Sequence, residues 1–256
     1  MTEEEIKPFV APCRELERGA PLKWLRAGWQ DFRSAPGLSL AWGGFCWILS
    51  TVVTVAAWKI GGWVLLLSVL SGFIFVAPLL AFGMYSVSRQ LCLGNKPTLA
   101  WTLKAARKPF TNSMVFTLVL LIIFLLWARA GTMVHIFFPS DGTVKLENLA
   151  LYLGVGSAIG SIFASICFAA SVFSLPFIAN RDADVITAVV SSINAVLRNR
   201  WVMFRWALLI VFLTALGFAT ALVGFALIIP LLGYATWHAY RDALDVSDWP
   251  VLPGAD

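Results

Sequence analysis

An apolar block runs from residue 201 to residue 240 with one charged side chain, Arg205. A helix of about 20 apolar residues crosses the roughly 30 Å hydrocarbon core of a bilayer, so this block predicts two crossings. We place the turn between them within residues 217–224. The whole chain is 59% hydrophobic and 13% charged, and a soluble core cannot take up that much apolar surface. The sequence therefore predicts an integral membrane protein.

Other apolar stretches extend this prediction to an all-α, polytopic membrane helical bundle with about six transmembrane helices. The further spans are expected at residues 37–58, 63–87, 113–138 and 149–178. Before each pair of spans, apolar residues recur at helical spacing opposite polar ones, which indicates a surface helix at the headgroup level. These surface helices are expected at residues 21–32, 97–110 and 184–198, and Asp184 is a favourable N-cap for the last of them.

A proline-centred motif organises these segments into repeats. GFIFVAPLLAFGMYSVSRQL (residues 72–91) and GFALIIPLLGYATWHAYRDAL (residues 224–244) both have two leucines after the proline, spaced rings and an arginine near the end. A weaker copy surrounds Pro176. The motif gives seven candidate functional or packing positions: Pro78, Pro176, Pro230, Tyr234, Trp237, His238 and Arg241.

We expect three parallel repeats, each a surface helix followed by a two-span hairpin, because each unit crosses the membrane twice. An approximate three-fold axis would relate them. The units cover residues 21–91, 97–181 and 184–244 of a membrane domain at residues 21–245, with a polar leader at 1–20 and a tail at 246–256. Lysine and arginine number sixteen on the side of the termini and three on the other side, so leader and tail are expected in the cytoplasm.

Ionisable groups are sparse inside the predicted spans. No acidic residue falls between Asp31 and Asp141 or between Asp184 and Asp242. Ion-coupled carriers usually hold a carboxylate at mid-membrane, so this gap argues against a pump. The net charge of +5 lies beside the spans, which indicates lipid headgroups and not nucleic acid as the partner. No nucleotide-binding, metalloprotease or hydrolase motif is present, so we assign no catalytic residue.

Two features have both a structural and a functional interpretation. His238 is interpreted first as an interfacial hydrogen-bonding ring and second as a ligand for a cofactor. With His135 expected toward the opposite face, no metal or cofactor site is predicted. Gly156 and Gly160 belong to a stripe of small residues, which favours close helix packing over a ligand-lined groove.

Three segments carry a resemblance to a known family. They are WLRAGWQDFRSAPGLSL, SLPFIANRDADVITAVVSSINAVLRN and PLLGYATWHAYRDAL, and they lie in this order within about residues 20–245. The chain resembles a bacterial family of predicted integral membrane proteins catalogued as a domain of unknown function. The resemblance implies a multi-span inner-membrane protein without an established activity.

Some members of that family are labelled as cytochrome c oxidase subunits. The two histidines of this chain oppose a catalytic oxidase role, because a haem-copper core needs many more histidine ligands. Family sequences often have a histidine at the position of Tyr234, so this chain lacks one half of a two-histidine metal motif there.

Three functions remain open at this point. A non-enzymatic scaffold or accessory factor for another inner-membrane complex is favoured, because the sequence shows no buried charge and no catalytic group. The alternative is a carrier or channel for a small neutral or apolar solute, with the proline-containing helices lining a central path. An enzyme acting on lipid ranks third, because no acid-base pair is present.

The charge asymmetry gives a testable topology. Reporter fusions at Lys145 and at the C-terminus should report opposite faces of the membrane, because Lys145 lies in the loop on the lysine- and arginine-poor side. The measurement is the activity of a reporter that works on only one side. Activity on the same face at both positions would rule out the six-span arrangement.

Overall fold

The described structure is built from α-helices, as the sequence predicts. The computed structural model of the chain describes residues 8–99, 102, 110–137 and 146–252. Part of the predicted surface helix at 97–110 and the loop around Lys145 lie outside the described residues. The helices are α1 (Ala20–Ser34), α2 (Pro36–Cys92), α4 (Phe110–Phe137), α5 (Leu146–Ser171), α6 (Ser174–Asn180), α7 (Val185–Arg198), α8 (Arg200–Ala219) and α9 (Phe225–Ala243).

Four of the predicted spans coincide with segments long and apolar enough to cross a membrane. These segments are Pro36–Gly62, Asn112–Ala130, Gly154–Asn180 and Arg200–Ala219. The two remaining predicted spans are helical and correspond to the second half of α2 and to α9. The count of six spans therefore stays a prediction.

Both expected hairpin turns in the first and last units are present. Gly62 has φ 58° and ψ −146°, a conformation that only glycine adopts without strain, and it folds the two halves of α2 back on each other. The second turn lies between the end of α8 at Ala219 and the start of α9 at Phe225, inside the predicted range.

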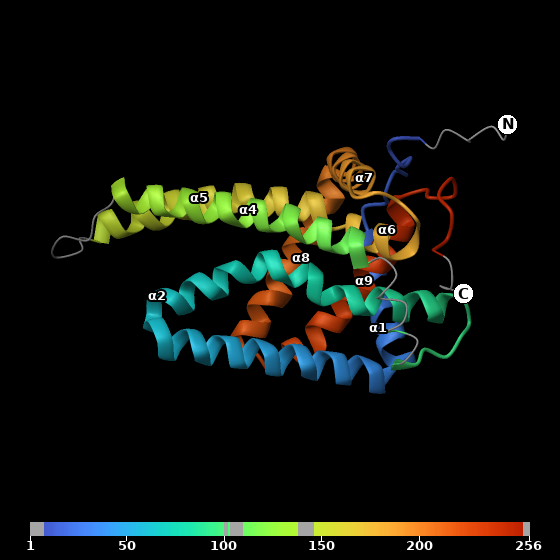
Figure 1. Cartoon of the computed structure of the whole chain (residues 1–256), viewed down its shortest axis with the longest axis horizontal. Coiled ribbons are helices and arrows are strands. Elements are labelled where there is room, and N and C mark those ends of the chain that lie inside the picture. Colours follow the sequence, from blue (N-terminus) through green and yellow to red (C-terminus); the bar gives the residue numbers. More distant parts are fainter. Residues whose placement is uncertain (1–7, 100–101, 103–109, 138–145, 253–256) are drawn as a thin grey trace.

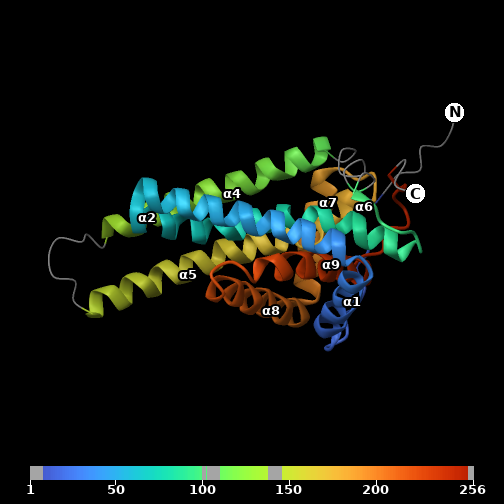
Figure 2. The ribbon, with the colours of Figure 1, turned by 90° about the horizontal axis from the view of Figure 1, so that it is seen from below.

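The long helices run along one direction and the short ones gather at one end. In Figure 1, α4 and α5 run together along the long axis, above the hairpin of α2. Helices α1, α6 and α7 and the described ends of the chain lie at the opposite end from the turn of α2. Figure 2 shows the same end-to-end arrangement from below, with α8 and α9 forming the shorter hairpin.

Helix α9 is held at very short distance by α1 and α2. A Cβ atom added to Gly43 of α2 would lie 1.8 Å from the carbonyl oxygen of Ala226, and one added to Gly28 of α1 would lie 2.7 Å from the amide nitrogen of Ala235. On α9 itself, a Cβ at Gly233 would lie 2.8 Å from Cβ of Met84. The helix backbones meet where side chains are missing, and α9 becomes the central helix of this part of the bundle.

Pro176 does not occupy a position equivalent to Pro78 and Pro230. Pro78 and Pro230 lie inside α2 and α9, whereas Pro176 is the third residue of the short helix α6. The predicted span at 149–178 is interrupted because α5 ends at Ser171. In the first turn of a helix the N–H that proline lacks has no intrahelical partner in any case, so Pro176 begins a helix instead of bending one.

The leader and the tail are both bound to the helical part of the chain, more firmly than the sequence indicates. The amide of Arg14 donates to the carbonyl of Ala243 at 2.8 Å, and the amide of Asp245 donates to the carbonyl of Pro12 at 2.8 Å, so the leader is held at the end of α9. In the tail, Pro250 accepts from the amide of Asp182 at 3.0 Å. The two ends of the chain therefore lie on the same side of the bundle.

Gly43 and Gly44 form a matched pair for testing the packing of α9. A Cβ at Gly44 would meet nothing within 4 Å, so Gly44→Ala should keep or raise stability, since alanine favours a helix over glycine by about 1 kcal/mol. Gly43→Ala should lower the free energy of unfolding by about 1–3 kcal/mol, because the methyl group overpacks the contact with α9. Thermal unfolding of both variants in detergent measures the difference, and equal midpoints would contradict the close approach.

Candidate functional site

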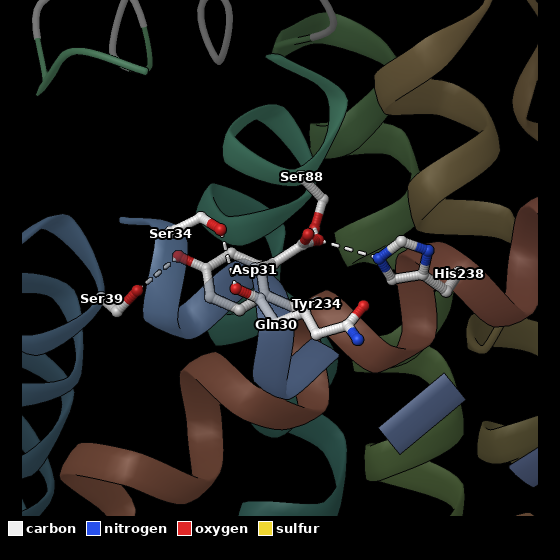
Figure 3. A network of polar contacts seen from close by, with 7 residues as sticks. All are labelled: Gln30, Asp31, Ser34, Ser39, Ser88, Tyr234 and His238. Atoms are coloured by element: carbon white, nitrogen blue, oxygen red, sulfur yellow. Dashed lines mark hydrogen bonds and ion pairs between the residues drawn. The ribbon is translucent and has the colours of Figure 1, made fainter. Parts of the chain in front are cut away.

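Helix α9 brings most of the predicted site residues to one region of the bundle. Tyr234 and Trp237 are buried, His238 is half-buried and Arg241 is exposed. Tyr234 and His238 are four residues apart, so they point to the same side of α9. That side faces α1 and the two ends of α2, where the polar contacts of Figure 3 are found.

The carboxylate of Asp31 is the centre of these contacts. Asp31 Oδ2 lies 2.9 Å from Nε2 of His238 and accepts a hydrogen bond from the Ser88 hydroxyl at 2.5 Å. The side chains of Asp31 and His238 are 13% and 23% exposed. Since these residues belong to α1, α2 and α9, one half-buried carboxylate ties three helices together (Figure 3).

Tyr234 forms a second tie on the same side of α9. Its hydroxyl lies 2.8 Å from Oγ of Ser39, and Ser39 itself donates to the carbonyl of Ala35 at 2.8 Å. A serine hydroxyl has one proton, so Tyr234 is the donor to Ser39. Because Ala35 connects α1 to α2, Tyr234 anchors the joint between these helices.

The same helix makes two further polar bonds near its C-terminal end. The indole nitrogen of Trp24 in α1 donates to Asp242 Oδ2 at 2.9 Å, and the amide nitrogen of Asn180 in α6 donates to the Tyr240 hydroxyl at 2.9 Å. Buried polar groups without partners are costly, so these bonds fix the rotation of α9 against its neighbours.

The order of the contacts around Asp31 does not match nucleophilic catalysis. In a hydrolase triad the histidine lies between the serine and the acid, and takes the serine proton. Here the acid lies in the middle, with Ser88 and His238 both bonded to it. Within the described residues there is also no group of three histidine, cysteine, aspartate or glutamate side chains that could hold a metal ion.

Asp31 corrects the sequence-based placement of the polar side of α1. The helical spacing of apolar and polar residues in 21–32 places Asp31 on the polar side of the surface helix, whereas the structure points it at His238. One signal was present in the sequence: Asp31 is three residues after Gly28 and seven after Trp24, so it shares their helical stripe. That stripe is the buried one, since both Gly28 and Trp24 are buried. Ser39 and Ser88 had no comparable signal.

The small-residue stripe on α5 makes no close contact in the described structure. A Cβ added to Gly156 or Gly160 would meet nothing within 4 Å. The close helix approach predicted for these glycines is therefore not made within the described part of the chain. Helix α5 is buried nearer its C-terminal end instead, around Cys167 and Ala170.

Comparison with known families supports the membrane assignment. Residues 64–180 match the sequence model of a family described as predicted integral membrane protein (DUF2189). The family resemblance is confirmed over this stretch. Searches of the curated proteins and of the solved structures found no match. Of the contacts described above, Ser88 lies in the matched region, whereas Asp31, Tyr234 and His238 lie outside it, so the DUF2189 match does not assign a role to the α9 contacts.

Replacing Asp31 tests whether these contacts hold the bundle together. Asp31→Ala leaves the hydroxyl of Ser88 and the ring of His238 without their acceptor, so it should lower the free energy of unfolding by about 1–3 kcal/mol. Asp248→Ala, at an exposed position of the tail, is the control and should change little.

The double variant Asp31→Ala/His238→Ala sharpens this test. Because both side chains belong to one contact, the combined loss measured by unfolding in detergent should be smaller than the sum of the single losses. Losses that simply add would mean that the two residues act independently.

Proposed function

We propose that this membrane protein is a non-enzymatic accessory factor that scaffolds another membrane complex. The observation that carries the proposal is that the polar side chains around α9 are bonded to one another between helices. Asp31, Ser88 and His238 are bonded to one another across three helices, and Tyr234 is bonded to Ser39. Polar groups that are bonded to one another between helices fix the positions of those helices. Their arrangement fits a rigid framework better than it fits acid-base catalysis.

The open face of α5 is compatible with a partner helix. Small residues on a membrane helix allow another helix to approach closely, and the space beside Gly156 and Gly160 is open. Within the accessory role, we assign this face to a helix of the partner complex. The cellular location that accompanies this role is the bacterial inner membrane, with both termini in the cytoplasm, supported by the positive charge on the side where the leader meets the end of α9.

The three-unit architecture belongs to the same proposal. Helix α1 precedes the hairpin of α2, and α7 precedes the hairpin of α8 and α9, so the first and last units have the same order of elements. Pro78 and Pro230 each lie inside the second helix of their hairpin. The interrupted α5 and α6 make the middle unit the divergent one.

Copurification tests the accessory role. The tagged chain, extracted from native membranes in mild detergent, should retain a defined set of membrane proteins. Gly156→Leu/Gly160→Leu should reduce their recovery several-fold, because the added side chains block close helix packing.

Ala158→Leu is the matched control, because Ala158 is exposed and points to the other side of α5. This variant should recover the same proteins as the natural chain. If the chain is extracted without any reproducible partner, the proposal is wrong. Uptake of a neutral solute by vesicles containing the purified chain would favour the carrier function instead.

A further inference from the structure

Helix α7 exposes one half of its apolar side, whereas Val189 and Val196 on the other half pack against the core. Among its large apolar residues, Ile186 and Leu197 are the most exposed, at 65% and 67%. Val190 and Ile193 lie between them at helical spacing and are partly exposed. We name these four residues, Ile186, Val190, Ile193 and Leu197, the α7 stripe.

The opposite side of α7 is fixed to the protein by hydroxyl groups. Ser191 Oγ accepts from the amide of Ala11 at 2.9 Å, and Ser192 Oγ accepts from the amide of Phe173 at 3.1 Å. Ser192 also donates to the carbonyl of Ala169 at 2.7 Å. These bonds join α7 to the leader and to the break between α5 and α6, so the helix cannot turn its apolar side inward without losing them.

The N-terminus of α7 is fixed as well. The side chain of Asp184 accepts a hydrogen bond from the amide of Thr187 at 2.9 Å, which confirms the predicted N-cap. Burial raises the pKa of Asp184, but hydrogen bonds from Thr187 and nearby amides lower it by more, so the pKa lies below its usual value. The cap is therefore charged at neutral pH, and it stabilises the start of the helix.

Exposed apolar residues continue along the sequence from α7 into α8. Trp201, Phe204 and Leu208 are exposed along the first half of α8, which is one of the segments able to cross a membrane. At the junction, the guanidinium carbon of Arg200 lies 5.9 Å from the centre of the Trp201 ring, and Arg198 is also exposed. A tryptophan beside arginines is typical of the headgroup level of a bilayer.

The direction of α7 fits a helix lying in the plane of the membrane. Figure 1 shows α7 nearly end-on, while α4 and α5 run along the long axis of the picture. Helix α7 therefore lies across the direction of the spanning helices, at the end where the leader and the tail lie.

We propose that α7 is an in-plane helix whose stripe is buried in the acyl chains of the leaflet on the side of the chain ends. Arg198 and Arg200 would then face the phosphates of that leaflet. Lipid is the occupant that the surface favours, because the stripe is followed directly in the sequence by the exposed apolar residues of α8, a segment able to cross a membrane. Its large aliphatic side chains also differ from the small residues that dominate contacts between membrane helices. The proposal is independent of the accessory role, since it concerns the purified chain in lipid alone.

Fluorescence quenching at two adjacent positions tests the proposal. In the full chain with Cys13→Ser and Cys92→Ser, the two remaining cysteines are buried, so an introduced cysteine can be labelled with bimane. The labelled variants are Ile186→Cys and Leu197→Cys on the stripe and Arg198→Cys beside it. Each is placed in vesicles of phosphatidylcholine and phosphatidylglycerol.

At Ile186 and Leu197, phospholipid with a nitroxide on its acyl chain should quench bimane several-fold more than iodide in the water. At Arg198, iodide should quench bimane more than the nitroxide phospholipid does. If all three labels respond mainly to iodide, the stripe faces water and the proposal is wrong. If neither quencher reaches the labels at Ile186 and Leu197, and Ile186→Cys crosslinks two copies of the chain, the stripe is a protein interface. That outcome would also overturn the proposal. A variant that lowers the thermal unfolding midpoint is replaced by Val190→Cys, which lies on the same stripe.

Discussion

The close approach of α9 to α1 and α2 is the contact on which the rest of the bundle depends. Between membrane helices there is no hydrophobic gain in leaving lipid, so association relies on close packing and hydrogen bonds. Gly28 and Gly43 provide the packing, because backbone atoms of α9 occupy the space where their side chains would be. Asp31 and Tyr234 provide the hydrogen bonds on the same side. Packing and polar contacts therefore act together on one helix.

Sequence patterns were sufficient for those parts of the fold that depend on composition and local chemistry. Apolar length located four spanning segments, the gap between the spans at 37–58 and 63–87 marked the turn at Gly62, and Asp184 marked the start of α7. The break between α5 and α6 was missed because the amide of Phe173, which lies at the break, donates to the hydroxyl of Ser192. Ser192 lies 19 residues further along the chain, in another helix. Such a contact has no local signature, and Pro176 was therefore assigned to a continuous span.

The candidate site could be predicted in part. The motif around Tyr234 and His238 drew attention to the correct side of α9, but their partners Ser39 and Asp31 come from other helices. The reason is that these buried polar groups find their partners in distant parts of the chain. Asp31 shares the buried stripe of α1 with Gly28, whereas the basic residues of the same helix are exposed. Ser191 of α7 is buried where it accepts a hydrogen bond from the leader, and amphipathic spacing alone does not reveal such a partner.

The pairing of the first described helix with the last one has a consequence for biosynthesis. Asp31 and His238 are 207 residues apart, and ribosomes add roughly 5–20 residues per second. After α1 has emerged, about 10–40 s therefore pass before α9 exists to receive it. During that interval the carboxylate of Asp31 has neither His238 nor the packed bundle around it. The first helix must wait for its partner, and a chaperone or the insertion machinery has a defined period in which to hold it.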